Sequence, residues 1–367
     1  MRPSLFCGII RLKYPHEGLR HCTSRLFRAF LSDAAKEPSK QWSFTVSPFT
    51  KIFCQLSCGV SVKPLDTHSL PGAEQVCVTL LGRSRDDVTA PETLQVHYDD
   101  QSKKLEVSSN ETISNLSVEL TAPIKSDLHI VGQGKGNVKI QNMESDVCQV
   151  QTEKGHCILQ SVKCHKVQVR SSGGNITGMG TINGDVEMIT AEHSRVDLKK
   201  IQGTSMNIST EHGPLNVKAI YAEKSAVASS SGKIHIGHIH GEALVNSDTG
   251  DIIIDSSSGV LTAHTNAGNI DAYVSQTGTA ELHTQQGAVS VRVPSTLKAW
   301  VHLCGTSVEG NSEILQETQI QSSEGKTVLT GPLNGGTRED CWISAIADRG
   351  TVSIKTQSWF ETLKLGS

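Results

Sequence analysis

Hydrophobic and polar residues alternate in a recurring pattern from about residue 130 onward. Segments such as "SSSGKIHI" and "SDTGDIII" each contain a turn position followed by a short alternating run. Apolar residues stand two and four places after that position and five places before it. Alternation with a period of two predicts β-strands with one buried face. The turn positions are Gly136, Gly155, Gly174, Ser194, Gly213, Gly232, Gly250, Gly268 and Gly287.

Successive turn positions are 18 to 20 residues apart, and such a fixed period is typical of a solenoid. Each copy is expected to form two short strands joined at a glycine that tolerates positive φ. Such strands cannot bury an apolar face alone, but copies stacked at roughly 4.8 Å form a parallel sheet over columns of aliphatic side chains. The sequence therefore predicts an all-β fold, a right-handed parallel β-solenoid of the single-stranded β-helix type with rungs of about 19 residues. Ile234, Ile252 and Ile270 should then be vertical neighbours.

Two later segments extend the pattern. The segments around Gly325 and Gly350 are predicted to be further copies, with Gly325 two periods beyond Gly287. A column of hydroxyl residues, three places before the turn position, is predicted to hydrogen-bond the backbone of neighbouring rungs. This structural role explains the column better than ligand binding does. Its members are Thr152, Ser171, Thr210, Ser229, Ser247, Thr265, Thr284 and Ser322.

The pattern divides the chain into four segments. They are a basic leader (1–41), an irregular β-rich capping region (42–130), the solenoid repeats (131–355) and a C-terminal cap (356–367). In the C-terminal cap, Trp359 and Phe360 are expected to form an apolar lid over an open sheet edge.

The leader is rich in arginine and poor in acidic residues, with apolar residues interspersed as in "RLFRAFL". This composition is typical of a mitochondrial presequence, which is cationic and amphipathic. A disordered basic tail on a cytoplasmic protein is the alternative. We therefore expect a mitochondrial location, with a cytoplasmic one as the second choice.

The composition of the chain indicates what kind of core it forms and which classes of partner are not expected. Aromatic residues make up only 4% of the chain, which suits a narrow aliphatic interior. The formal net charge of −3 indicates no general attraction to nucleic acid. No apolar run is long enough to predict a membrane span. The ten cysteines are scattered and form no C-x-x-C pair, so we expect free thiols in a reducing compartment and neither disulfides nor structural zinc.

Three histidines within seven residues, His235, His238 and His240, are the only candidate metal ligands that the pattern singles out. Their positions place His238 and His240 on an outer face, where two imidazoles could share a cation. No carboxylate or thiol column completes a ligand set in the neighbouring copies, so exposed strand histidines are the favoured interpretation. A second cluster, Glu192-His193 and Glu211-His212, predicts that His193 stacks over His212 with the carboxylates alongside.

No enzyme signature such as a nucleophile elbow, P-loop or H-E-x-x-H motif is present. We therefore predict no catalytic residues, no cofactor and no established metal site. Acidic residues that a carbohydrate-active solenoid would need are spread along the repeats rather than clustered. They are Asp185, Glu187, Asp197, Asp251, Asp255 and Asp271.

The repeated unit S/T-x-x-G-x-I-x-I, seen in "STEHGPLNV", "SSSGKIHI" and "SDTGDIII", resembles the bacterial "putative adhesin" domain of unknown function. The resemblance covers residues 105–295 and extends more loosely to 355. It implies a β-solenoid without established catalytic residues. The prediction is a non-catalytic scaffold or protein-interaction module that binds an unidentified protein and could self-associate through the solenoid ends. The alternative is a carbohydrate-active or metal-dependent enzyme acting on an outer face.

Overall fold

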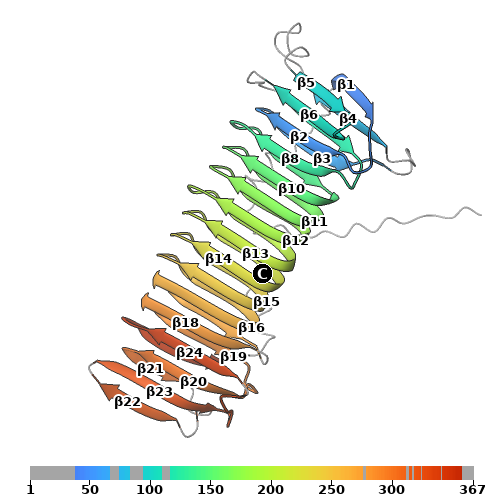
Figure 1. Ribbon diagram of the computed structural model, residues 1–367. Helices are drawn as coiled ribbons and strands as arrows, with labels where there is room; N and C mark the ends of the chain where they lie inside the picture. Colours follow the sequence, from blue (N-terminus) through green and yellow to red (C-terminus); the bar gives the residue numbers. More distant parts are fainter. Residues whose placement is uncertain are drawn as a thin grey trace, which may run out of the picture. The chain divides into compact units, whose positions relative to one another are not determined.

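The computed structural model describes the chain from residue 38 to 357, with gaps. The regular secondary structure of the described part consists of β-strands (Figure 1). The described segments are 38–66, 74–82, 94–109, 116–275, 278–310, 314–315, 318–323, 325–339 and 341–357. The predictions for most of the basic leader, and for the lid formed by Trp359 and Phe360, therefore lie outside the described residues.

Six long strands form the regular part of the fold. Each pairs in parallel with the next one in the chain, so that they lie side by side in sequence order (Figure 1). The expectation of two short strands per rung is wrong here, because each rung is one bent strand of 14 to 16 residues. These strands are β11 (Cys157–Ser171), β12 (Ile176–Thr190), β13 (Val196–Thr210), β14 (Leu215–Ser229), β15 (Ile234–Ser247) and β16 (Ile252–Ala267).

The core consists of aliphatic columns that run from rung to rung. Ile234 pairs with Ile252, and Ile252 pairs with Ile270, and all three side chains are fully buried. The parallel β-solenoid, with about nine turns and rungs of about 19 residues, is thereby confirmed. The prediction that the residue five places before the turn position belongs to the buried column is wrong in two rungs, for Val131 and Ile189. There Ile130 and Met188 are the buried members of the column, in register with Val150 and Val169 respectively.

The turn glycines are required for a steric reason. A Cβ atom on Gly155 would lie 1.9 Å from the carbonyl oxygen of Gly136, one rung away. The expected reason, tolerance of positive φ, is wrong for most of the predicted turn glycines. Among the eight from Gly136 to Gly287, only Gly287 has positive φ (149°). Positive φ occurs instead at Gly241 (98°) and Gly259 (110°), which are partners in adjacent rungs.

At the N-terminal side, spatial order departs from chain order. Strands β2 (Lys51–Leu56) and β3 (Gly59–Pro64) form a rung that sits on β8 (Asp127–Gly132) and β9 (Val138–Gln141). A Cβ atom on Gly136 would lie 2.5 Å from the carbonyl oxygen of Cys58, so Cys58 takes the turn position in this rung. The repeat period does not reveal this rung, because its turn residue is not glycine and the rung on which it stacks is distant in sequence.

Two strands that lie between β4 (Gln75–Leu81) and β8 in the chain pair with the other side of that rung. Strand β6 (Lys104–Ser109) pairs with β2, and β7 (Ser117–Ala122) pairs with β3, both in parallel. Antiparallel strands complete this region, since β1 pairs with β4, β4 with β7, and β5 with β6. These three strands are β1 (Pro38–Thr45), β4 (Gln75–Leu81) and β5 (Leu94–Asp99), and β10 (Glu144–Thr152) then leads from β9 into the regular stack.

The C-terminal side contains an insertion. Strands β17 (Ile270–Val274), β18 (Thr279–Gln286) and β19 (Val289–Val293) follow the regular stack, with β17 and β18 each pairing with β16. Strands β18 and β19 then pair with β24 (Trp342–Ala347) and β25 (Thr351–Thr356). Two strands from the intervening sequence, β20 (Ala299–Gly305) and β21 (Ser307–Gly310), pair in parallel with β24 and β25 and so continue the stack by a further rung.

The inserted residues form their own strands and correct one prediction. They are β20 (Ala299–Gly305), β21 (Ser307–Gly310), β22 (Gln319–Ser323) and β23 (Lys326–Leu333). Gly325 lies between the antiparallel strands β22 and β23, so the expected copy around Gly325 is a hairpin and Ser322 does not join the hydroxyl column. The true successor of Gly287 is Gly350, where a Cβ atom would lie 1.8 Å from the Gly287 carbonyl oxygen.

The described part of the chain contains no helix of the length and hydropathy needed to cross a membrane. Strand pairing and burial do not test the predicted right-handed winding, which stays a prediction.

Candidate functional site

The three candidate histidines, His235, His238 and His240, lie on strand β15 but have separate partners. His235 Nε2 lies 2.8 Å from Asp255 Oδ2, and His240 Nδ1 lies 3.0 Å from Ser258 Oγ, both on β16. His238 is exposed and pairs through its backbone with Ser256. Among the residues that the structure describes, no group of three or more His, Cys, Asp and Glu is placed to hold a metal ion. The geometry therefore gives no support to a metal site at these positions.

The second histidine cluster is arranged as the sequence predicts. The rings of His193 and His212 are stacked at a tilt, with their centroids 5.3 Å apart. Glu211 accepts a hydrogen bond from the Glu192 backbone N–H at 2.8 Å, and it lies 3.6 Å from His212 Nε2. The carboxylate thus bridges two rungs, which is a structural role.

The acidic residues of the repeats are engaged in contacts between or along rungs. Asp271 Oδ1 lies 2.7 Å from Arg292 Nε, and Asp251 Oδ1 accepts the backbone N–H of Asn269 at 2.8 Å. Gln168 and Arg170 donate to Glu187, and these hydrogen bonds hold its pKa below the usual value. The remaining acidic candidates, Asp185, Asp197 and Asp255, bind Ser205 N–H, Asn216 and His235 respectively.

The hydroxyl column bonds a neighbouring rung's backbone, as the sequence predicts, where Thr284 Oγ1 donates to the carbonyl oxygen of Gly268 at 2.8 Å. Other members bond the next hydroxyl group of the column or the backbone of their own turn. Thr210 Oγ1 donates to Ser229 Oγ at 3.1 Å, and Ser229 Oγ also accepts the backbone N–H of Gly232 at 2.8 Å. Thr152 donates in the same way to Ser171 at 3.0 Å. These side chains are buried, so each hydrogen bond satisfies a polar group that water does not reach.

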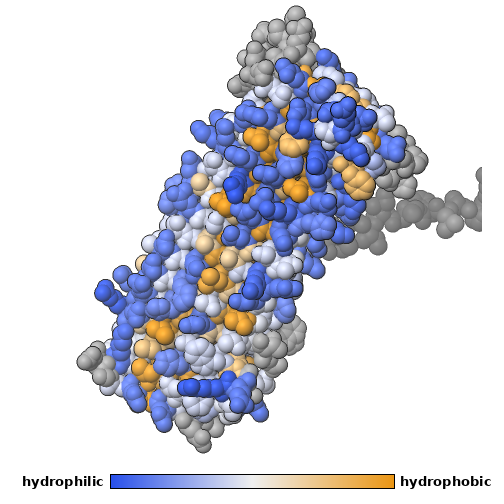
Figure 2. All heavy atoms as spheres, in the orientation of Figure 1, coloured by the Kyte–Doolittle hydropathy of each residue, from blue (hydrophilic) through white to orange (hydrophobic). Residues whose placement is uncertain are grey.

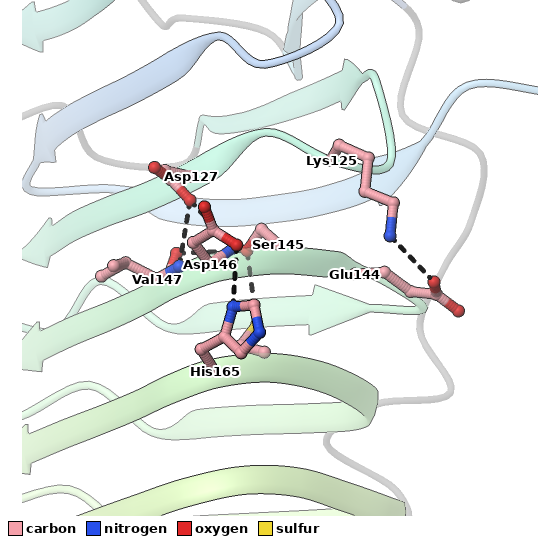
Figure 3. A network of polar contacts seen from close by, with 8 residues as sticks. Lys125, Asp127, Glu144, Ser145, Asp146, Val147 and His165 are labelled. Atoms are coloured by element: carbon pink, nitrogen blue, oxygen red, sulfur yellow. Dashed lines mark hydrogen bonds and ion pairs between the residues drawn. The ribbon is translucent and has the colours of Figure 1, made fainter.

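A site that sequence reasoning missed lies where β10 meets β11. Residues of β8, β10, β11 and the adjoining loops line a hollow of about 310 Å³. Lys125 Nζ lies 3.4 Å from Glu144 Oε2, and His165 Nδ1 lies 2.8 Å from Asp146 Oδ1 (Figure 3). Asp127 accepts the backbone N–H groups of Asp146 and of Val147, the next residue (Figure 3).

Thiols lie at the floor of this hollow. Cys164 is one of its lining residues, and its Sγ lies 3.3 Å from Ser145 Oγ. Cys148 lies deeper, with no exposed surface, and shares a hydrogen bond with Cys164. A third thiol, Cys157, is fully buried nearby. None of the eight cysteines that the structure describes takes part in a disulfide.

These three thiols differ in acidity. Hydrogen bonds from Cys148 and then from Ser145 lower the pKa of the Cys164 thiol to about 7, although burial opposes them. The hydrogen bond to Cys164, followed by burial, raises the pKa of Cys148. Burial raises the pKa of Cys157 to about 12. The thiolate therefore forms most readily at Cys164, the residue that reaches the hollow.

Exposed apolar side chains form the other surface feature. The face shown in Figure 2 carries small, separate apolar groups among hydrophilic residues. Three large exposed residues lie on consecutive strands of the regular stack, namely Tyr221 on β14, Leu244 on β15 and Val260 on β16. Their exposed fractions are 43%, 42% and 50%.

Stacked rungs, aliphatic columns and a column of turn glycines define the chain as a β-solenoid repeat protein. The sequence matches the Toastrack DUF4097 family over residues 73–236 and 181–355. The chain belongs to this family.

Among solved structures, the chain is similar to bacterial proteins described as "putative adhesins". One from Parabacteroides merdae has 12% identity and a TM-score of 0.34, with 86% of this chain and 96% of that chain covered. One from Bacteroides fragilis has 14% identity and a TM-score of 0.27, with 87% and 96% covered. One from Parabacteroides distasonis has 13% identity and a TM-score of 0.33, with 69% and 96% covered.

Proposed function

We propose that this protein is a non-catalytic scaffold that binds a protein partner on the outer surface of strands β14 to β16. The observation that carries the proposal is the occurrence of Tyr221, Leu244 and Val260 on three successive rungs. Isolated apolar residues on a surface need no explanation, but three of them on three successive rungs, each in a different column, offer a protein partner apolar contacts along this part of the stack.

The surroundings of these residues favour contact with another molecule. Leu244 stands in register between Ala226 and Thr262, so small neighbours leave its side chain raised above the sheet. The Lys200 ammonium group lies 5.1 Å from the centre of the Tyr221 ring and provides a charged border. Strand pairing on both sides holds the backbone in place, so binding would cost little conformational entropy.

The test compares the full-length protein with a Tyr221→Ser/Leu244→Ser/Val260→Ser variant as bait in cells. A partner that co-purifies stoichiometrically with the wild type should be reduced at least about tenfold with the variant, which corresponds to about 1.4 kcal/mol. Phe49→Ser is the matched control, because Phe49 is 69% exposed but lies between β1 and β2.

Circular dichroism must first show that the variant keeps the wild-type fold. The partner should then bind the purified wild-type protein directly and bind the variant more weakly. Equal recovery of the same partner with the wild type and with the folded variant would contradict the proposal.

The location is a separate proposal, which rests on the composition of the leader. Residues 1–40 fused to a fluorescent reporter are expected to direct it into mitochondria. A diffuse cytosolic signal would contradict this expectation.

Self-association through the solenoid ends is proposed as a second mode of interaction. Strand β22 pairs with β23 alone among the described strands, and its Ile320 side chain is 65% exposed. Exposed strand edges can pair with another chain. Sedimentation before and after deletion of residues 358–367 tests this mode, and an unchanged monomer in both would rule it out.

A further inference from the structure

The thiols at the junction of β10 and β11 are arranged as a reactive residue above a partner residue. Ser145 on β10 is in register with Cys164 on β11, which places the Cys164 side chain beside the start of β10. Cys148 lies three residues further along β10, and its thiol is hydrogen-bonded to Cys164. The two sulfur atoms therefore lie close together on adjacent rungs.

Access from solvent is unequal. Cys164 lines the hollow of about 310 Å³, whereas Cys148 has no exposed surface and lies behind it. A molecule as small as a hydroperoxide can enter such a hollow and meet Cys164 first. Cys148 is then the residue placed to react with an oxidised Cys164.

We propose that Cys164 and Cys148 form a redox-active thiol pair, which hydroperoxides convert into a disulfide between β10 and β11. This inference is independent of the scaffold function. The pair is a modification site beside the hollow. The exposed apolar residues Tyr221, Leu244 and Val260 are not among the residues that line this hollow.

The chemistry has two balanced steps. In the first, the Cys164 thiolate attacks a peroxide oxygen, so that an S–O bond forms, the O–O bond breaks, and hydroxide or alkoxide leaves and takes up a proton. Sulfur is oxidised to sulfenic acid and the peroxide is reduced. In the second, Cys148 loses its proton and attacks the Cys164 sulfur, so that the S–S bond forms and the S–O bond breaks. The departing hydroxide takes the proton and leaves as water.

Local electrostatics support this order of events. The hydrogen bonds from Cys148 and Ser145 that lower the pKa of Cys164 stabilise its thiolate at neutral pH. The ionisable groups around the hollow are mixed in sign, with Asp127 opposing the thiolate charge. The others that line the hollow are Lys125, Glu144, Asp146, Lys163 and His165.

The positions of the lysines make the test direct. Trypsin cleaves after Lys139, Lys154, Lys163 and Lys166, which places Cys148, Cys157 and Cys164 on three different peptides. Purified, reduced full-length protein is treated with hydrogen peroxide, blocked with iodoacetamide, digested and analysed by mass spectrometry. We expect peptide 140–154 to be joined to peptide 164–166, with Cys164 losing its free thiol at least about tenfold faster than Cys157.

Three variants assign the roles. Cys148→Ser should leave a sulfenic acid on Cys164 that dimedone traps, because no second thiol is in place. Cys164→Ser should abolish the disulfide. Cys157→Ser is the matched control and should leave the Cys148–Cys164 disulfide unchanged, since Cys157 is equally buried.

Accessibility alone predicts a different result, because Cys77 and Cys304 are the partly exposed thiols among the described residues. If these two oxidise as fast as Cys164, or if Cys157 pairs with either thiol, the proposal is overturned. Failure of the wild-type protein to form the Cys148–Cys164 disulfide under a tenfold excess of peroxide would also overturn it. The wild-type result decides even if a variant does not fold.

Discussion

In strands β11 to β16 each rung pairs with the rung that follows it in the chain, whereas at both ends adjacent rungs are far apart in sequence. Strands β2 and β3 lie between β6 and β7 on one side and β8 and β9 on the other. Strands β24 and β25 lie between β18 and β19 on one side and β20 and β21, which precede them in the chain, on the other. The same rung geometry is thus reached by two different paths of the chain.

The difference concerns how the contacts form. In the middle, one repeat can stack on the previous one as soon as both exist, because the chain between them is one turn long. At the ends, a long segment must return before its strands can pair, which costs loop-closure entropy and slows folding. We therefore expect the middle of the stack to be the more cooperative and the more sensitive to steric change.

The largest expected effect comes from the glycine column. Gly155→Ala would place a Cβ atom 1.9 Å from the Gly136 carbonyl oxygen, so the rungs must separate. We expect a loss of at least about 4 kcal/mol in the free energy of unfolding, measured by urea denaturation.

The control for the glycine column is Gly59→Ala in the N-terminal rung. The nearest atom to the new Cβ there would be the Ser117 Cβ at 3.7 Å, which is ordinary contact. Its expected change is within about 0.5 kcal/mol. If both variants unfold at the wild-type urea concentration, the steric account of the column is wrong.

Removal of core volume should have the next largest effect. Ile252→Ala opens a cavity between Ile234 and Ile270 and is expected to cost about 3 kcal/mol. Leu329→Ala, in the C-terminal hairpin, removes a side chain that is still 5% exposed and should cost about half as much. Urea denaturation measures both, and equal losses would remove the proposed contrast between the middle and the ends.

The hydroxyl column should give a smaller effect. Ser229→Ala leaves the buried Gly232 N–H and the Thr210 hydroxyl without their acceptor, and should cost about 1 to 2 kcal/mol. Ser209→Ala is the matched control, because Ala228 naturally occupies the same position in the next rung. Thermal unfolding of the two variants should separate them, and identical melting temperatures would refute the role given to Ser229.

The smallest effect concerns pH at the last rung. Hydrogen bonds from His283 and from Lys326 hold the pKa of Asp348 below its ordinary value of 3.8. The lowered pKa means that the charged carboxylate stabilises the fold above about pH 3.8, and that this stabilisation is lost as pH falls through the folded-state pKa. Because more than a third of the Asp348 side chain is exposed (39%), solvent screening keeps the contribution below about 1 kcal/mol.

This contribution is measured as the difference in melting temperature between the wild type and Asp348→Asn. The difference should be present at pH 6 and disappear towards pH 3. A difference that grows as the pH is lowered would contradict the expected sign.

The regular part of the fold was predictable because its information is local. Alternation around positions such as Gly232 and Gly250 identifies inward residues, and a constant period identifies their neighbours in the stack. Where the period changes to 20 residues, around Ser194, the prediction for Ile189 failed, because the extra residue lies in the turn between β12 and β13. Counting five places back from Ser194 therefore reaches an outward-facing residue of β12, and the inward-facing one is Met188. The rung with Cys58 at its turn and the hairpin at Gly325 were not predicted for a related reason, because neither stacks on a segment one period away in the chain.

The candidate sites were predictable only in part. The prediction that His193 stacks over His212 is confirmed, because both residues occupy the same place in adjacent rungs. The sequence did not reveal the contact of Cys148 with Cys164, which are at different places in their rungs and lie on the adjacent strands β10 and β11. The spacing of these cysteines alone carries no signal, and only the bend of β10 and β11 brings the two thiols together.

The sequence by itself determined which side chains form the aliphatic columns and how far apart the rungs are in the chain, because period-two alternation and a nineteen-residue repeat are properties of neighbouring residues. The tertiary structure alone decided which distant segments complete the ends, why glycine is needed at the turns, and which thiol is reactive. These features depend on atoms from different rungs meeting within a few ångströms, and no property of one segment specifies such a meeting.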